Sequence, residues 1–169
     1  AYLKMVNTRF VCDYKEKKTP DYTGIDDLQF LFSANKNSSL QPVSDIASGG
    51  EISRLMLCLK AMIAGAVALP AIIFDEIDTG TSGDVADRVG DIMKEMSNGM
   101  QVIVITHLPQ IASKGDLHYK VYKEETDIEM TTNIKMLTSS ERIEEIAGML
   151  SGAEISNEAL QNARVMLGV

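Results

Sequence analysis

Apolar residues follow two different spacings along the chain, and the two alternate. Between residues 52 and 63 they recur every three or four positions, which predicts an amphipathic helix in a unit that ends at Pro70. Ala71–Phe74 is a short continuous apolar run, of the kind that forms a strand buried on both faces of a parallel sheet, and Gln101–Ile105 is predicted to be the next buried strand. The pattern from Asp84 to Met96 predicts a second helix between them. Strands that alternate with helices predict an α/β fold with a mainly parallel sheet flanked by helices.

The two ends of the chain carry other patterns. Arg9–Tyr14 and Leu28–Phe32 alternate or carry aromatic residues, and the segment between them holds Pro20 and Gly24. This predicts a small antiparallel β layer whose strands are joined by a turn-rich loop. Near the other end the pattern predicts two strands and then two helices, at about 117–123, 128–137, 140–150 and 156–167.

The composition is that of one globular domain spanning residues 1–169. Its 169 residues are 45% hydrophobic, which is enough for one core and too little for two. The longest apolar stretch, 62–73, is interrupted by Gly65 and Pro70, so it predicts a helix running into a strand and no membrane span. The chain starts without Met and without a signal-peptide pattern, and we expect a cytosolic protein cut from a longer one.

Charge and metal-ligating side chains narrow the classes of function. The formal net charge is -8, whereas a protein that grips DNA phosphates usually has a basic face, so we do not expect this chain to be the main DNA contact. An acidic chain can still bind a magnesium nucleotide, because the metal and backbone N–H groups supply the positive field. The two histidines and two cysteines are not spaced as zinc ligands, which argues against a zinc site.

Two adjacent carboxylates, Asp75 and Glu76, follow the first apolar strand. Ligands of open α/β sheets bind at the carboxyl ends of the strands. In ATPases with a phosphate-binding loop, an aspartate at such a position holds the magnesium shell, and a neighbouring carboxylate can orient the attacking water. The alternative is a turn that the two side chains merely cap, and the pair alone leaves both interpretations open.

The first predicted helix begins with Ser48, Gly49, Gly50 and Glu51. Ser followed three residues later by Glu is the pattern of an ordinary capping box, which is one interpretation. Two glycines at a helix start lower its stability unless something must approach the backbone closely. A phosphate is the natural candidate, because free N–H groups and the helix dipole both favour an anion at this end.

Thr106 and His107 directly follow the second apolar strand. A lone histidine is more often structural than catalytic, so His107 alone indicates little. Its place at the end of the strand that follows the Asp75 strand makes it a candidate for the same site.

The order of these features resembles that of the ATP-binding-cassette ATPases. A Gly-Gly helix, a strand with Asp-Glu, a Gly/Ser loop, a helix and a strand with His match that family's signature motif, Walker B motif, D-loop and H-loop. In detail the chain is similar to the RecN family of DNA repair proteins, in residues 47–54, 73–83 and 106–112. Glu51, where transporters commonly have Gln, and the Gly80–Gly83 loop point to the same DNA-repair branch.

The resemblance implies a site that is shared between two ATPase heads. Ser48, Gly49 and Gly50 would contact the γ-phosphate of ATP bound on a partner head, and Glu51 would belong to the same nucleotide-binding motif. Asp75 would hold Mg²⁺ through water, Glu76 would polarise the attacking water, and His107 would contact the γ-phosphate. Asp78 and the loop to Gly83 would carry the message between the two sites. The chain would be the C-terminal lobe of such a head.

One motif of the family is absent. A phosphate-binding loop needs G-x-x-x-x-G-K-[ST], and none of the 12 glycines is followed by Lys. The family keeps that loop in an N-terminal half, beyond a coiled coil. The chain alone is therefore expected to be inactive and to expose a sheet edge and apolar surface. Its implied partners are the N-terminal half of the same head, a second head in a homodimer and, in the intact protein, nucleoid DNA.

Three other functions remain as alternatives. The chain could belong to a nucleotide-dependent dimerisation module of a structural protein, in which hydrolysis is incidental. It could also belong to a transporter ATPase subunit, which the residues around the motifs disfavour and which would need a membrane partner. A serine hydrolase using Ser48 or Ser82 is the third, but the chain has no G-x-S-x-G elbow.

Overall fold

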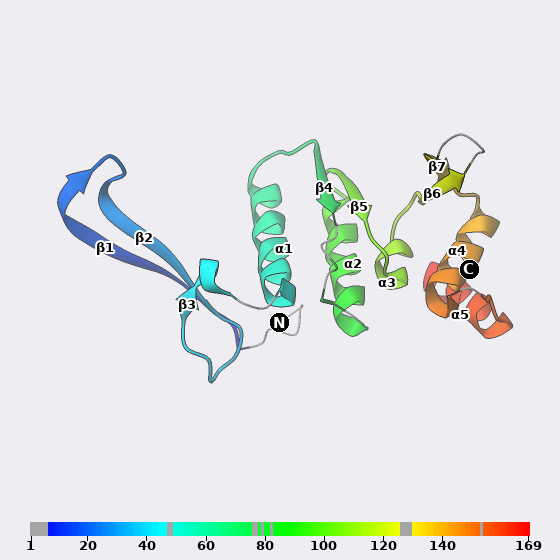
Figure 1. Ribbon diagram of the computed structural model, residues 1–169, viewed down its shortest axis with the longest axis horizontal. Coiled ribbons are helices and arrows are strands. Elements are labelled where there is room, and N and C mark those ends of the chain that lie inside the picture. Colours follow the sequence, from blue (N-terminus) through cyan, green and yellow to red (C-terminus); the bar gives the residue numbers. More distant parts are fainter. Residues whose placement is uncertain are drawn as a thin grey trace. The chain divides into compact units, whose positions relative to one another are not determined.

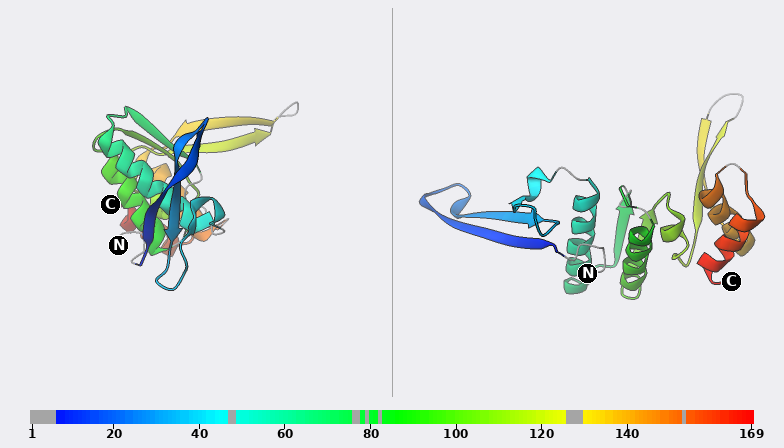
Figure 2. Two further views of the ribbon diagram at one scale, coloured as in Figure 1. Left: turned by 90° about the vertical axis from the view of Figure 1, so that its left-hand side faces the viewer. Right: turned by 90° about the horizontal axis from the view of Figure 1, so that it is seen from below.

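The chain folds as two compact units. The computed structural model describes residues 7–46, 49–75, 78, 80–81, 83–125, 130–152 and 154–169. The first unit comprises Ala1–Ala68 with Thr79–Thr81, and the second comprises Leu69–Asp78 with Ser82–Val169. Figure 1 shows the elements in chain order and Figure 2 gives two further views of them. The assignment of 1–169 to a single lobe stays a prediction.

The first unit opens with the expected antiparallel layer. β1 (Arg9–Asp21) and β2 (Gly24–Ser33) form a long hairpin, and β3 (Gln41–Pro42) lies beside β2 (Figure 1). Both long strands extend further than the sequence predicts, because the turn between them is tight. The Asp21 carboxylate accepts hydrogen bonds from the backbone N–H of Thr23 at 2.8 Å and from its hydroxyl at 2.6 Å, which closes the turn.

Helix α1 (Gly49–Ala66) completes the first unit after the short 3₁₀ helix η1 (Val43–Asp45). α1 starts where the sequence predicts and buries Leu55, Leu57 and Ala64. Met62 and Ile63, which the spacing predicts for the apolar face, are exposed by 71% and 56%. Apolar surface on α1 is therefore left uncovered by the described part of the chain.

The second unit contains the predicted parallel pair. β4 (Ala71–Asp75) and β5 (Gln101–Ile105) pair in parallel with Asp75 opposite Ile105, and α2 (Asp84–Met96) connects them. α2 lies beside the pair (Figure 1) and buries Ala86, Val89 and Met93, while Phe74 of β4 is buried too. The bounds of α2 and β5 are those predicted.

The sequence predicts β4 and β5 to be buried on both faces, and in the described part of the second unit one face is not buried. Ile73, Ile103 and Ile105 alternate with inward residues along the pair and remain exposed by 61%, 42% and 53%. The described residues leave the face that carries these isoleucines open. Continuous apolar runs of this kind are typical of sheets that are covered on both faces.

The rest of the second unit is a hairpin and a helix pair. The hairpin strands are antiparallel, and both they and the helices lie close to the predicted ranges: β6 (Tyr119–Glu125), β7 (Met130–Met136), α4 (Ser139–Ser151) and α5 (Asn157–Leu167). Helix α3 (Pro109–Ala112) is too short for its periodicity to predict it. α4 and α5 pack together through Ile146, Ala147, Ala159 and Ala163. The three alanines let the two backbones approach closely.

The fold is therefore α/β with mixed sheets. The parallel part is the β4–β5 pair, and a three-stranded and a two-stranded antiparallel sheet accompany it. Among the described residues, no helix combines the length and the apolar content needed to cross a bilayer.

Candidate functional site

The predicted site residues fall into two groups. Gly49, Gly50 and Glu51 form the first turn of α1 in the first unit. Asp75 ends β4, and Asp78, Thr106 and His107 follow β4 and β5 in the second unit. Ser48 and Glu76, predicted for phosphate binding and for catalysis, lie outside the described residues.

The two glycines at the start of α1 serve different purposes. A carbon added to Gly50 would lie 2.9 Å from the carbonyl oxygen of Gly80, a clash that no real side chain makes. Gly80 has a φ of +74°, a left-handed conformation that favours glycine. An added carbon on Gly49 would meet no heavy atom within 4 Å. The glycine pair predicts that something approaches the backbone closely, and at Gly50 this is the backbone of Gly80. At Gly49 the space beside the backbone is open.

The N-terminus of α1 carries positive potential. The first N–H groups of this 18-residue helix have no intrahelical acceptor, and the helix dipole adds about half a positive charge. A guanidinium nitrogen of Arg54 lies 3.5 Å from the position that a carbon on Gly50 would take. An anion could approach the backbone at Gly49.

Asp75 is an exposed carboxylate at the end of β4. Because β4 and β5 are parallel and pair in register, the chain leaves both strands at the same edge of the sheet. Mg²⁺ in nucleotide sites is held by one or two carboxylates together with water and phosphate oxygens, so one exposed Asp fits this ion. The described residues contain no group of three His, Cys, Asp or Glu side chains that could enclose a metal by themselves.

Asp78 joins the ends of the two parallel strands. Its side chain is fully buried, and its Oδ2 accepts hydrogen bonds from the hydroxyl of Thr106 and from the backbone N–H of His107 at 3.2 Å. The same oxygen lies 3.5 Å from His107 Nδ1. The Thr106 hydroxyl oxygen also accepts the backbone N–H of Leu108 at 3.0 Å. The His107 side chain itself is 72% exposed.

The segment after His107 is held from two sides. α2 packs against α3 so closely that a carbon on Gly90 would lie 3.2 Å from the carbonyl oxygen of Gln110. From α4, the Arg142 guanidinium donates hydrogen bonds to the carbonyl oxygens of Ser113, at 3.0 Å, and of Gly115. Sequence reasoning gave Arg142 no role, because a side chain that binds carbonyl groups 27 and 29 residues away leaves no local pattern.

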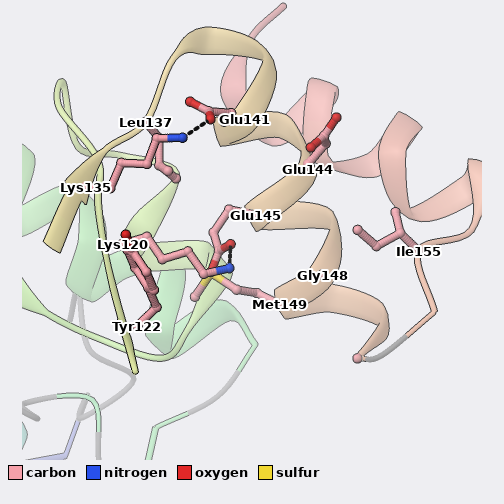
Figure 3. Close-up of a pocket in the computed structure, with 11 residues that line it drawn as sticks. Lys120, Tyr122, Lys135, Leu137, Glu141, Glu144, Glu145, Gly148, Met149 and Ile155 are labelled. Carbon is pink, nitrogen blue, oxygen red and sulfur yellow. Dashed lines mark hydrogen bonds and ion pairs between the residues drawn. The ribbon is translucent and has the colours of Figure 1, made fainter. Parts of the chain in front are cut away.

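A cavity of about 590 Å³ lies between the β6–β7 hairpin and α4, and none of the predicted site residues is among those that line it (Figure 3). Two ion pairs, Lys120 with Glu145 and Lys135 with Glu141, join the hairpin to the helix. The polar side of the hairpin therefore faces α4. The cavity is lined by Lys120, Tyr122, Lys135, Leu137, Glu141, Glu144, Glu145, Gly148, Met149, Gly152 and Ile155.

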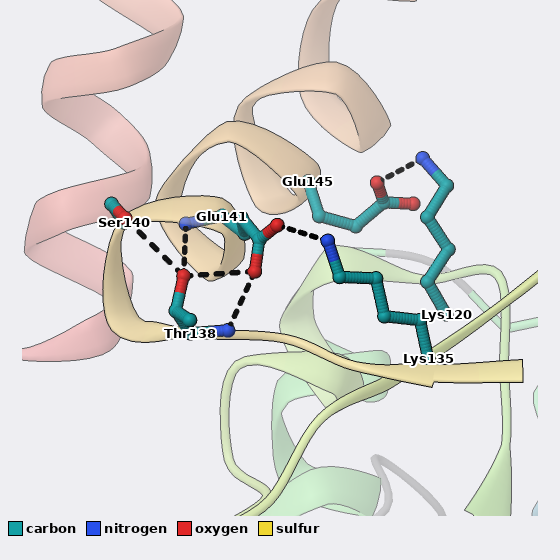
Figure 4. Close-up of polar contacts among 6 residues, drawn as sticks. All are labelled: Lys120, Lys135, Thr138, Ser140, Glu141 and Glu145. Carbon is teal, nitrogen blue, oxygen red and sulfur yellow. Dashed lines mark hydrogen bonds and ion pairs between the residues drawn. The ribbon is translucent and has the colours of Figure 1, made fainter.

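Glu141 caps α4, and this makes stability depend on pH (Figure 4). The ion pair with Lys135 and the hydrogen bonds from Thr138, at 2.9 Å from its backbone N–H and 2.8 Å from its hydroxyl, lower the Glu141 pKa to about 2. A carboxyl group with a lowered folded-state pKa stabilises the fold above its ordinary pKa, and this contribution fades as the pH falls toward the lowered value. We expect Glu141→Gln to unfold at a lower temperature than the unmodified chain at neutral pH, and the gap to narrow between about pH 4.5 and 2.

The matched control is Glu144→Gln, which makes the same change of charge on the same helix without touching the cap. Its unfolding midpoint should follow that of the unmodified chain through the acid range. Thermal unfolding monitored by circular dichroism at several pH values measures both. A gap for Glu141→Gln that stays constant down to pH 2 would contradict the assignment.

Comparison with curated proteins finds a consistent set of relatives. The chain is 45% identical over 165 residues to the DNA repair protein RecN of Rickettsia bellii, a match that covers 98% of the chain. It spans 30% of the length of that relative. No family model matches the chain. The similarity to RecN that the motifs predict is confirmed.

Comparison with solved structures finds the same fold. The chain matches an Smc head domain with a coiled coil and joint from Pyrococcus yayanosii with a TM-score of 0.65 and 20% identity, over 86% of the chain and 26% of that protein. It also matches an SMC ATPase, from work on ATP-driven dimerization and DNA-stimulated activation, with a TM-score of 0.58 and 20% identity. That match covers 87% of the chain and 83% of the other. These matches confirm a fold like that of an SMC or ATP-binding-cassette head.

Proposed function

We infer that this chain, which is homologous over nearly its whole length to part of the RecN DNA repair proteins, supplies one half of a composite ATPase head in a protein of that kind. The observation that carries the inference is the 45% identity over 165 residues, which cover 98% of the chain. The different surroundings of the two glycines add support. Gly49 has open space beside it at the helix N-terminus, whereas Gly50 lies against the backbone of Gly80.

In this proposal the residues at the start of α1 and the residues that follow β4 and β5 act on two different ATP molecules. Ser48 and Gly49 bind the γ-phosphate of ATP held by a second head, through the free N–H groups of α1. Asp75 holds Mg²⁺, which when bound supplies positive charge to the phosphates. Glu76 orients and polarises the attacking water. His107 contacts the γ-phosphate of the ATP on its own head.

The rest of each site comes from elsewhere in the intact protein. This chain has no phosphate-binding loop, and it spans less than a third of the relatives' length. The uncovered face of β4 and β5, with Ile73, Ile103 and Ile105, fits an N-terminal half that packs on it, because an apolar patch of this kind marks an interaction surface. With a net charge of -8 the chain is not the main DNA contact of such a protein, which would act in the cytoplasm on nucleoid DNA.

Substitution of Gly49 by Arg tests the proposal. An added side chain at Gly49 meets open space in the chain itself, so folding should persist. In the intact protein it would project into the approaching phosphate and second head, and ATP-dependent association of heads should be lost. Sedimentation velocity of the intact protein with and without ATP measures this association.

Gly65→Arg is the matched control. It places the same residue on the same helix, at another position where an added carbon meets open space. Gly65→Arg should still associate with ATP, and both variants should unfold at the temperature of the parent protein. Normal ATP-dependent association of Gly49→Arg would refute the proposed role of this helix start.

A further inference from the structure

We propose that Asp78 is a positioning residue for His107, and that it does not contact the nucleotide. This deepens the proposed function and rests on it. The family resemblance implies that Asp78 and the loop to Gly83 carry the message between the two sites, and the structure shows the partners of its carboxylate. Its carboxylate is fully buried and accepts hydrogen bonds from Thr106 and from the backbone N–H of His107.

Charge and burial argue against contact between Asp78 and phosphate. A carboxylate has no proton to donate to a phosphate oxygen and repels it through like charge. The Asp78 side chain has no exposed surface, whereas the His107 side chain is 72% exposed. Of the two, the imidazole is therefore the group that a ligand at this edge of the sheet can reach.

A single carboxylate oxygen organises the turn after β5. Asp78 Oδ2 holds the Thr106 hydroxyl and the His107 backbone, and the Thr106 hydroxyl oxygen in turn accepts the N–H of Leu108 at 3.0 Å. One carboxylate oxygen thus holds Thr106 and His107 directly and Leu108 through the Thr106 hydroxyl. Hydrogen bonds to a charged acceptor are roughly twice as strong as neutral ones, so this anchor is stiffer than an amide would provide.

The same oxygen also orients the imidazole ring. His107 Nδ1 lies 3.5 Å from Asp78 Oδ2, which turns that nitrogen inward and leaves Nε2 to meet a ligand. α3 begins two residues after His107, and the turn that follows α3 is held by Arg142. His107 is therefore fixed on its N-terminal side by Asp78 and on its C-terminal side by α3.

The experiment is steady-state ATP hydrolysis by the intact RecN-like protein that contains this chain. Asp78→Asn keeps the size of the side chain and removes its charge. It should lower kcat by about 10- to 100-fold, as loss of an orienting partner does at comparable sites, while KM for ATP changes little. Asp27→Asn, on exposed β2, is the control and should behave as the parent.

Thr106 provides a second test that does not remove the carboxylate. Thr106→Ser keeps the hydroxyl group and should retain most of the activity. Thr106→Val keeps the shape but cannot donate to Asp78, so it should lower kcat in the same way as Asp78→Asn. Equal losses in the Ser and Val variants would overturn the inference, because a purely steric role would not distinguish them in this way.

A double-mutant cycle with His107→Ala decides whether Asp78 acts through the histidine. If it does, Asp78→Asn should cause almost no further loss of kcat in the His107→Ala background. Losses that multiply would overturn the inference, as would a raised KM with unchanged kcat, which is the signature of a direct nucleotide contact.

Failure of the inference can be told from failure of the proposed function. The variant Glu76→Gln, measured alongside, reports on the hydrolytic site itself. If Glu76→Gln is inactive and the losses at Asp78 and His107 multiply, the proposed function stands and the inference is overturned. If Glu76→Gln hydrolyses ATP at the parent rate, the proposed function fails, and the role of Asp78 in hydrolysis fails with it.

Discussion

Replacing Glu76 by Gln in the intact protein should lower ATP turnover by about 100- to 10,000-fold, which is the range that a positioned acid–base group contributes. Glutamine has almost the same shape as glutamate but cannot take up a proton from the attacking water. ATP binding should persist, because the proposed phosphate contacts come from Ser48, Gly49 and His107 and from the phosphate-binding loop of the N-terminal half. Release of inorganic phosphate measures turnover, and filter binding of labelled ATP measures affinity.

The control is Glu95→Gln on the exposed side of α2, which should leave turnover unchanged. A repair assay in cells extends the test to the alternative of a dimerisation module. If hydrolysis drives repair, both Glu76→Gln and Ser48→Arg should abolish it. Survival of cells that carry Glu76→Gln, with loss of cells that carry Ser48→Arg, would favour nucleotide-dependent dimerisation with incidental hydrolysis.

Local patterns were sufficient to predict much of the fold. α2 and β5 have the predicted bounds, because each has one unambiguous apolar spacing between clear breaks in the sequence. The start of α1 was predictable from Ser48 and the glycines that follow it. The antiparallel hairpin of β1 and β2 was predictable in kind but not in length, since its turn depends on side-chain hydrogen bonds of Asp21.

The features that sequence reasoning missed depend on residues far apart in the chain. The contact between Gly50 and Gly80 joins residues that no local spacing relates, so the sequence suggested only that something comes close. Asp78 was assigned to the site, but its hydrogen bonds to residues 28 and 29 positions away were not foreseeable. The exposed face of β4 and β5 has a different origin. Apolar runs predict burial, but they do not show whether the same chain provides the cover.

The central claim is that this chain supplies half of a split ATP site, and restoring the other half should switch on hydrolysis. The sequence has no phosphate-binding loop motif, and the described residues leave Ile73, Ile103 and Ile105 of β4 and β5 exposed. A separately produced N-terminal half that carries the loop would provide the motif and cover these side chains. Burying the apolar face should bring the halves together, and the loop should complete the phosphate site.

The most direct measurement is therefore phosphate release by the chain alone and after addition of that N-terminal half. Glu76→Gln in the same mixture is the control for hydrolysis at this site, and should remain inactive while the two halves still associate. A split ATP site should give no turnover by the chain alone and ATP hydrolysis on mixing. Turnover by the chain alone would reveal a complete phosphate site within these 169 residues, and the half-head assignment would have to be abandoned.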